Sequence, residues 1–262
     1  MSNARESPSD TGGRAFQPAS FIPLHCALED ITIAVKPGEP PRPTPDMLER
    51  WSRACKHNPR LFNGPKLRFM AFNPDTRTIT AHRGTYLRYA MQDHDPGATD
   101  PGTDIYHLAV SGVIVATDPN TGCDSILLGT RGIETFLYPG MWELAPGGGL
   151  ESTDIYSQLL LEMEEELGVH GLVDGSRRDT MLKPPGATDV LGLVIDPNTP
   201  GVDVVVRLQL RAGAEQAMGQ ASWEYGSTRF VPVTALAAFV EQEGPHAIIP
   251  PVLAIWRSMG WV

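Results

Sequence analysis

The feature that most constrains this chain is a glycine-rich turn followed by an acidic helix, in residues 146–169, which read PGGGLESTDIYSQLLLEMEEELGV. The last two helical turns carry Glu162, Glu165 and Glu166 at the spacing i, i+3 and i+4. At about 100° per residue these carboxylates crowd one helix face, where like charges repel unless a cation lies between them. The adjoining helix face is apolar and can pack on a core. It carries Tyr156, Leu159, Leu160, Met163 and Leu167.

The acidic face suits a divalent metal, with Mg²⁺ the first expectation and Mn²⁺ the alternative. Mg²⁺ takes oxygen ligands and prefers one or two carboxylates together with substrate phosphates over a closed protein cage. Gly147 and Gly148 let a substrate approach the backbone closely, and the helix N-terminus that follows favours negative charge. The alternative is an ordinary glutamate-rich helix with a solvated face. The coincidence of the glycines, the glutamate spacing and the closing Gly168 favours the metal site.

The same segment resembles the signature of the Nudix hydrolases, which reads Gly, five residues, Glu, seven residues, then Arg-Glu-apolar-x-Glu-Glu-x-Gly-apolar. Residues 162–169 match the second half of this signature in every position after the Arg. Leu161 stands in place of the Arg, and Thr153 stands in place of the first Glu. Counted forward from Gly148 instead, Asp154 replaces that Glu and the loop is one residue short.

The resemblance implies an α+β fold, namely a Nudix-type α/β/α sandwich with a mixed sheet, and the metal-dependent hydrolysis of a diphosphate linkage. Glu162, Glu165 and Glu166 would then be metal ligands and catalytic residues, one of them also orienting or deprotonating the attacking water. In the family the Arg–Glu pair orients the metal-binding carboxylates, and here that pair is missing or rebuilt from other residues. A non-catalytic Nudix-fold protein that binds or senses a nucleotide is therefore the competing function.

Two residues outside the helix extend the expected site. Glu224 precedes a strand and a helix, where many Nudix proteins carry a further glutamate that binds metal or acts as the base. Arg131 ends the strand before the glycine turn, and its planar guanidinium can bind a phosphate. Each of them has a plainer alternative as an ordinary surface residue. We therefore expect Glu224 to be catalytic, and Arg131, Gly147 and Gly148 to contact the substrate.

The chain divides into three expected parts, which are a disordered polar tail (1–16), an amino-terminal α+β segment (17–105) and a Nudix-like domain (106–262). In the amino-terminal segment we expect an extended stretch (21–35), a Pro-rich linker (36–45), a helix over Asp46–Cys55 capped by Asp46, a strand pair (66–73 and 76–84), a short helix (85–92) and a loop (93–104). In the later domain we expect a strand hairpin (107–117 and 124–132), the acidic helix, a strand pair (189–197 and 201–212), a strand (227–234), a helix (235–243) and a final helix over Ala247–Ser258.

The amino-terminal segment looks like the module that precedes the Nudix fold in the eukaryotic UDP-glucose pyrophosphatase branch. Residues 49–69 and 83–92 carry this likeness. In that branch the module helps to hold the uridine and the sugar, and the motif likewise lacks the Arg. The alternative is a structural cap on the Nudix core. The resemblance gives as candidate substrate or structural contacts Asn63, Lys66, Arg68, Tyr86 and Arg88.

Composition excludes several other classes of partner. The net charge of −10 and the pI near 5.1 argue against a nucleic-acid polymer, which is bound by clustered Lys and Arg. Cys26, Cys55 and Cys123 lack the spacing of a disulfide framework or a zinc site, which favours a reduced, cytoplasmic chain. No apolar run approaches the ~18 residues of a membrane span, so we expect no membrane partner. The oligomeric state stays open.

We therefore expect a Mg²⁺-dependent hydrolase that acts on a nucleoside diphosphate linked to another moiety, with a UDP-sugar as the first candidate. Water would attack one phosphorus of the diphosphate and release a nucleoside monophosphate and a phosphorylated product. The alternative substrates are ADP-ribose, a dinucleoside polyphosphate, and an isoprenyl or specialised-metabolite diphosphate.

Overall fold

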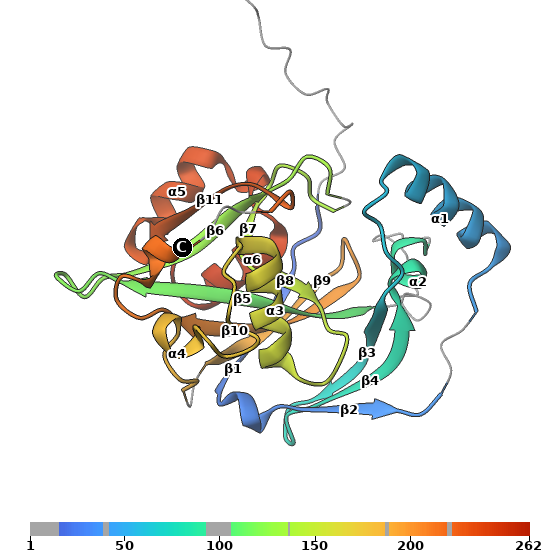
Figure 1. Cartoon of the computed structure of the whole chain (residues 1–262), viewed down its shortest axis with the longest axis horizontal. Coiled ribbons are helices and arrows are strands. Elements are labelled where there is room, and N and C mark those ends of the chain that lie inside the picture. Colours follow the sequence, from blue (N-terminus) through green and yellow to red (C-terminus); the bar gives the residue numbers. More distant parts are fainter. Residues whose placement is uncertain (1–15, 39–41, 93–105, 136, 187–188, 219–221) are drawn as a thin grey trace, which may run out of the picture.

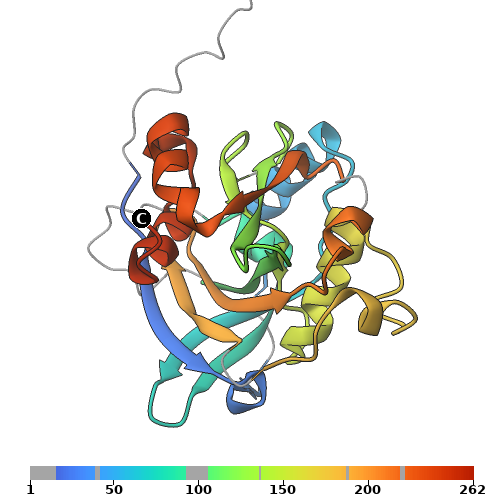
Figure 2. The same cartoon turned by 90° about the vertical axis from the view of Figure 1, so that its left-hand side faces the viewer.

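The computed structural model describes residues 16–38, 42–92, 106–135, 137–186, 189–218 and 222–262. Within these residues the chain forms an α+β fold, in which helices cover both faces of a mixed sheet (Figure 1; Figure 2). The expected disordered tail, apart from Phe16, and the expected loop over 93–104 lie outside the described residues.

The sheet runs in the order β1-β9-β10-β5-β3-β4-β2, while β6 and β8 also pair with β5, and β7 and β11 pair with β6. The pairs β5–β10 and β2–β4 are parallel and the other pairs are antiparallel. The strands are β1 (Ser20–Cys26), β2 (Thr32–Lys36), β3 (Pro65–Asn73), β4 (Thr78–Thr85), β5 (His107–Thr117), β6 (Asp124–Arg131), β7 (Trp142–Leu144), β8 (Gly147–Gly149), β9 (Val190–Asp196), β10 (Gly201–Gln209) and β11 (Tyr225–Pro232). The α-helices are α1 (Pro45–His57), α2 (Tyr86–Ala90), α3 (Ile155–Leu167), α4 (Arg178–Met181), α5 (Leu236–Glu243) and α6 (Pro250–Ser258).

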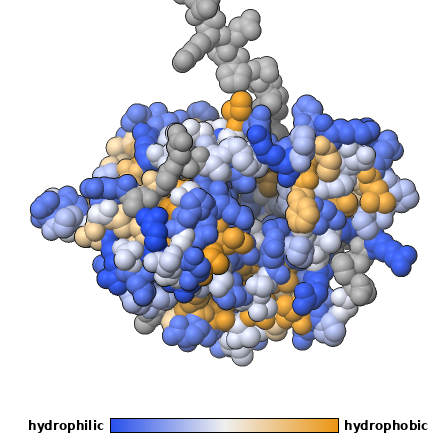
Figure 3. All heavy atoms as spheres, in the orientation of Figure 1, coloured by the Kyte–Doolittle hydropathy of each residue, from blue (hydrophilic) through white to orange (hydrophobic). Residues whose placement is uncertain are grey.

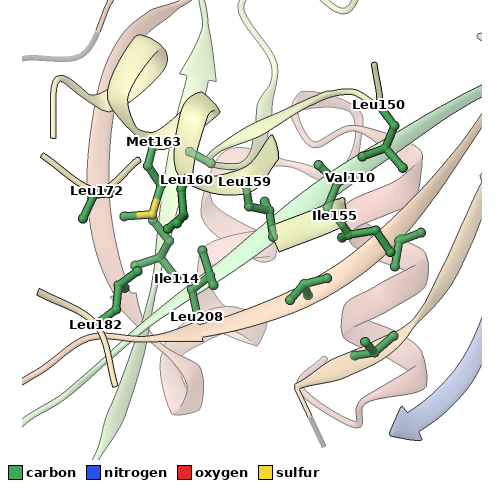
Figure 4. Close-up of a cluster of buried hydrophobic side chains, with 14 of the residues drawn as sticks. Val110, Ile114, Leu150, Ile155, Leu159, Leu160, Met163, Leu172, Leu182 and Leu208 are labelled. Carbon is green, nitrogen blue, oxygen red and sulfur yellow. The ribbon is translucent and has the colours of Figure 1, made fainter. Parts of the chain in front are cut away.

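Strand β5 contributes to two separate cores because successive side chains of a strand point to opposite faces of the sheet. Val110 and Ile114 lie in the core beneath α3, together with Leu159 and Met163 of that helix (Figure 4). Val113, between them, belongs to the second core, which α5 and α6 cover. This layered arrangement confirms the expected α+β fold with a mixed sheet.

Helix α3, which carries the acidic motif, has well-defined ends. Its N-cap is Asp154, whose Oδ1 accepts a hydrogen bond from the Ser157 N–H at 2.9 Å. It ends at Gly168, which adopts the left-handed conformation (φ 65°) that glycine reaches without a steric penalty. The prediction of a glycine turn leading directly into the helix is wrong, because Gly147–Gly149 forms strand β8, which pairs with β5. The carboxylate of Asp154 therefore occupies the helix N-terminus that was expected to favour a substrate anion.

Two helices begin at different residues from those expected. The cap of α1 is Thr44, not Asp46, since Thr44 Oγ1 accepts from the Met47 N–H at 3.2 Å and a proline follows at the first helical position. Asp46 instead forms an ion pair with Arg50, one turn further along the helix. The last helix begins at Pro250 because a separate 3₁₀ turn, Pro245–Ala247, precedes it.

The amino-terminal segment shares its sheet with the rest of the chain. The expected strand pair is confirmed as antiparallel β3 and β4. The expected single extended stretch over 21–35 is instead two strands separated by the 3₁₀ turn Leu28–Asp30, because β1 pairs with β9 and β2 pairs with β4. The division of the chain near residue 105 stays a prediction.

The face seen in Figure 3 is mostly hydrophilic, with apolar side chains in scattered groups. Large apolar side chains that are exposed include Phe62, Ile133 and Trp223. None of the helices in the described part of the chain is long and apolar enough to cross a membrane.

A partly buried carboxyl group in the sheet gives the fold a testable pH dependence. Asp203 of β10 accepts a hydrogen bond from Ser111 Oγ of β5 at 2.7 Å, and burial raises the pKa of Asp203 to about 6. Because this pKa lies above its value in an unfolded chain, the stabilising contribution is complete below about pH 4 and is lost as the pH rises through about 6.

We predict that Asp203→Asn, which mimics the protonated carboxyl, unfolds at a higher urea concentration than the wild type at pH 8. The gain should be of order 2 kcal/mol, and it should vanish near pH 4, where the wild-type carboxyl is itself protonated. Urea titrations of both proteins at several pH values measure this difference, from which all shared titrating groups cancel. Parallel pH curves for the two proteins would show that Asp203 does not carry the effect.

Candidate functional site

The three glutamates of the motif are divided between the inside and the outside of α3. Glu162 and Glu166 are buried, with exposed fractions of 8% and 4%, while Glu165 is exposed. Glu165 still lies close enough to Glu162 for its charge to raise the pKa of that carboxyl. The structure therefore brings together Glu162 and Glu166 on the inner face, with Glu165 beside them on the outer one.

Glu162 lies directly against strand β8. Its Oε1 accepts a hydrogen bond from Gln158 Nε2, one turn earlier on α3, at 2.8 Å. A Cβ on Gly148 would overlap this same carboxylate, so a side chain there would force Glu162 to move. Gly148 was expected to contact the substrate. The geometry shows a second reason for glycine at this position, because the missing side chain lets Glu162 approach the backbone closely.

Glu166 is fixed from two directions. Its Oε2 accepts a hydrogen bond from the backbone N–H of Gly147 at 3.0 Å and another from the Tyr225 hydroxyl at 3.1 Å. Gly147 lies on β8 and Tyr225 on β11, so three elements far apart in the sequence meet at one carboxylate. These contacts determine where Glu166 can present its other oxygen.

The site concentrates negative charge. Burial raises the pKa of Glu162 to about 7, and the charges of Glu165 and Glu224 add to this rise, while Gln158 and Lys66 oppose it. The pKa of Glu166 is raised well above its ordinary value by burial and by the repulsion of Glu162, Glu224 and Glu143. A cation between these carboxylates would remove the repulsion.

Glu224 lies near the acidic helix. Its charge acts on both Glu162 and Glu166, and its own side chain is half-buried. The backbone on either side fixes this segment, because the Ser222 N–H donates to the Glu166 carbonyl at 2.7 Å and the Gly132 N–H donates to the Glu224 carbonyl at 2.6 Å. The catalytic role expected for Glu224 stays a prediction.

Arg131 is engaged inside the protein. Its Nη1 donates to both carboxylate oxygens of Glu143 at 2.7 Å, and its Nε donates to the Leu137 carbonyl at 2.7 Å. Sequence reasoning proposed a phosphate contact for Arg131, which stays a prediction, and it missed Glu143 and Tyr225. The signal for Glu143 was a charged residue between the apolar Trp142 and Leu144 on a short strand, whereas no pattern marks Tyr225.

The amino-terminal segment reaches the edge of this site. Lys66 Nζ of β3 donates to the Gly149 carbonyl at 3.2 Å and forms an ion pair with Glu151 at 3.1 Å. Tyr86 of α2 lies near Arg131 and Glu224, whose charges act in opposite directions on its pKa, while burial raises it. Two of the candidate residues from this segment, Lys66 and Tyr86, therefore adjoin the acidic cluster. This cluster consists of Glu162, Glu165, Glu166 and Glu224.

The other candidates from this segment have different surroundings. Asn63 Oδ1 accepts from the Leu87 N–H at 2.8 Å, so this side chain fixes the start of α2. Arg88 Nη1 donates to the Arg42 carbonyl at 2.9 Å, which ties α2 to the chain before α1. Arg68 lies on β3 in register with His107 of β5, and its Nε is buried without a hydrogen-bond partner among the described residues.

The donor set fits a hard divalent cation. Across the described ranges, no three His, Cys, Asp or Glu side chains are arranged to hold a metal ion by themselves. Glu162 and Glu166 each keep one carboxylate oxygen without a hydrogen bond to the residues that the structure describes. Two carboxylates that leave the remaining positions to water and substrate phosphates match the preference of Mg²⁺.

No protein-family model matches the chain, and no curated protein matches it. Part of the chain is similar to solved structures, among them Nudix hydrolases. A Nudix hydrolase from M. Smegmatis is 15% identical, covers 59% of this chain and 83% of its own, and has a TM-score of 0.39. The MutT protein from Methanosarcina mazei Go1 is 18% identical over 59% of this chain and 93% of its own, with a TM-score of 0.42. DR0079 from Deinococcus radiodurans is 16% identical over 72% of this chain and 98% of its own, with a TM-score of 0.43. At these values the function has to be argued from the site itself.

The close contact between β8 and α3 gives a prediction with a matched control. We expect Gly148→Ala to lower the free energy of unfolding by about 1–3 kcal/mol, because the new methyl group displaces Glu162 and breaks its bond to Gln158. Gly147→Ala should cost less than about 1 kcal/mol, since the nearest atom to its Cβ is the Val110 carbonyl oxygen at 3.4 Å. Urea unfolding measures both, and equal losses would contradict the proposed contact.

Proposed function

We propose that this protein is a Mg²⁺-dependent, Nudix-type hydrolase that cleaves the diphosphate linkage of a nucleoside diphosphate joined to another moiety. The observation that carries this proposal is the buried pair Glu162 and Glu166, neither of which has a salt bridge within the described part of the chain. Burying ionised carboxylates together is costly unless a cation joins them. The burial of two carboxylates against the glycine strand β8 is therefore best explained if both are metal ligands.

Glu162 and Glu166 would hold the metal from the inner face of α3, and Glu165 would complete the acidic rim. A divalent metal supplies charge neutralisation and Lewis acidity at a diphosphate. The chain itself contributes orientation, because Gln158 directs Glu162 and the Gly147 N–H directs Glu166. Glu224, half-buried beside both, is the candidate to orient or deprotonate the attacking water.

The amino-terminal segment would select the substrate, with a UDP-sugar as the favoured class. Lys66 and Tyr86 support this role, since both adjoin the acidic cluster from β3 and α2. A basic and an aromatic residue at this edge suit the phosphate and the base or sugar of a nucleotide. ADP-ribose or a specialised-metabolite diphosphate has the same phosphate chemistry, and a substrate panel separates these classes.

A second candidate function is a nucleotide-binding or sensor protein without turnover. The observation that favours it is Leu161, a partly buried apolar residue where the signature carries Arg. An apolar side chain cannot form the ion pair that orients the carboxylates in the family. Metal-dependent ligand binding without product release would support this alternative over the hydrolase.

The metal site gives the first functional prediction. Glu162→Gln combined with Glu166→Gln should abolish Mn²⁺ binding and hydrolysis, because the two amides keep the shape of the site and remove its charge. Glu241→Gln is the matched control, since Glu241 is exposed on α5 and lies outside the acidic cluster. Calorimetric Mn²⁺ titration and release of nucleoside monophosphate are the two measurements. Unchanged Mn²⁺ affinity in the double variant would contradict the proposed ligands.

The role of the amino-terminal segment gives a second prediction. Arg68→Ala should raise the KM for the best UDP-sugar by a factor equivalent to about 1–3 kcal/mol and leave the Mn²⁺ affinity unchanged. Arg88→Ala is expected to have the same effect on KM. Its thermal melt is recorded as well, because Arg88 also holds the Arg42 carbonyl. If both variants retained the wild-type KM, the segment would be a structural cap and the UDP-sugar assignment would lose its support.

A further inference from the structure

Glu166 lacks the orienting cation that the signature places on its own helix. At that position stands Leu161, and Thr153 or Asp154 stands in place of the paired glutamate. Asp154 is already used as the N-cap of α3, through the Ser157 N–H and hydroxyl. The carboxylate that this pair would orient is nevertheless held, by the Gly147 N–H and by the Tyr225 hydroxyl. The support for Glu166 therefore comes from other strands.

Tyr225 of β11 packs against β6. Its ring lies over Gly129, where a Cβ would overlap the ring, so the glycine is what admits it. Tyr225 is also the register partner of Arg131 on the neighbouring strand. With its ring fixed in this way, the fully buried hydroxyl is directed at Glu166 Oε2, 3.1 Å away.

The same tyrosine lies beside an ion pair. Glu143 is close enough for its charge to raise the pKa of Tyr225, and it receives two charge-assisted bonds from Arg131 Nη1 at 2.7 Å. Glu143 is the register partner of Gly129, so β6, β7 and β11 together hold the ion pair and the tyrosine side by side. Arg131 is itself anchored by the bond from its Nε to the Leu137 carbonyl.

We propose that Arg131, acting through Glu143 and Tyr225, is the positioning cation for Glu166 and takes the place of the arginine that α3 lacks. The inference rests on the proposed function, since it assigns these residues to the same metal site. Arg131 is well suited to this role because its planar guanidinium stays charged when buried and offers several donors in a fixed arrangement. Neither Arg131 nor Glu143 touches the ligand in this assignment, so both are positioning residues.

The test compares two tyrosine variants that each lose one hydroxyl donating to a carboxylate. Tyr225→Phe removes the bond to Glu166 and keeps the ring over Gly129. Tyr138→Phe is the control, since it removes a comparable bond, to Asp196 Oδ2 at 2.6 Å, away from the acidic cluster. For Tyr225→Phe we expect a loss of about 10–100-fold in Mn²⁺ affinity and in kcat, the usual effect of removing a residue that orients a metal ligand, with KM changed less than about twofold. Tyr138→Phe should match the wild type in all three.

Arg131→Lys and a double variant test whether the residues act as one unit. Arg131→Lys should not retain wild-type function, because lysine keeps the charge but not the paired geometry of the guanidinium. Glu143→Gln combined with Tyr225→Phe should be no worse than the more damaging single change, whereas independent residues would give effects that multiply. Thermal midpoints of all variants separate a loss of fold from a loss of position.

The outcomes distinguish this inference from the proposed function. A wild type that binds Mn²⁺ and a Tyr225→Phe variant that binds it equally well and turns over equally fast would overturn the inference alone. Multiplying effects in the double variant would also overturn it. A wild type that binds Mn²⁺ without hydrolysis still allows the affinity comparison, and a wild type that binds no Mn²⁺ overturns both.

Discussion

The site depends on the repulsion between two buried carboxylates of one helix, Glu162 and Glu166. Burial raises the cost of ionising both groups, and the charge of Glu162 adds to that cost for Glu166. The surroundings direct both groups, and the charge of Lys66 offsets only part of the rise in the Glu162 pKa. Gln158 and the Gly147 N–H each donate a hydrogen bond, and Gly148 provides the space. A structure that orients negative charge and leaves it uncompensated is prepared for a cation, and this is the physical basis of the proposed metal site.

The sheet brings the required groups to this helix. Strand β5 carries β8 near one end and β6 near the other, so the glycine backbone and the strand that holds Arg131 have a common support. β6 then pairs with β7 and β11, which place Glu143 and Tyr225 beside Arg131. The amino-terminal strands extend the same sheet and bring Lys66 to the opposite edge of the acidic cluster. The core beneath α3 fixes the face that the helix turns towards these groups.

Local patterns in the sequence predicted the elements and the acidic helix, because helix and strand periodicities depend on neighbouring residues. The spacing placed Glu162, Glu165 and Glu166 on one face. The structure keeps Glu162 and Glu166 together on the inner face and leaves Glu165 exposed beside them. The cap at Thr44 was missed because Asp46, two residues later, is also a favourable capping residue. Tyr225 was missed for a different reason. Tyr225 lies 59 residues beyond Glu166 in the sequence, and only strand pairing brings the two together. No local pattern carries that information.

The central claim is that Glu162 and Glu166 hold a divalent metal that binds a diphosphate. The most direct measurement is ³¹P electron–nuclear double resonance on the Mn²⁺-loaded protein with a non-hydrolysable UDP-sugar analogue. The account predicts a ³¹P coupling that shows direct coordination of phosphate oxygen to Mn²⁺ in the wild type. It also predicts that the wild-type spectrum differs from that of Mn²⁺ and the analogue without protein, and that this difference disappears when both glutamates are replaced by glutamine. A wild-type spectrum identical to that of Mn²⁺ and the analogue without protein would contradict the claim.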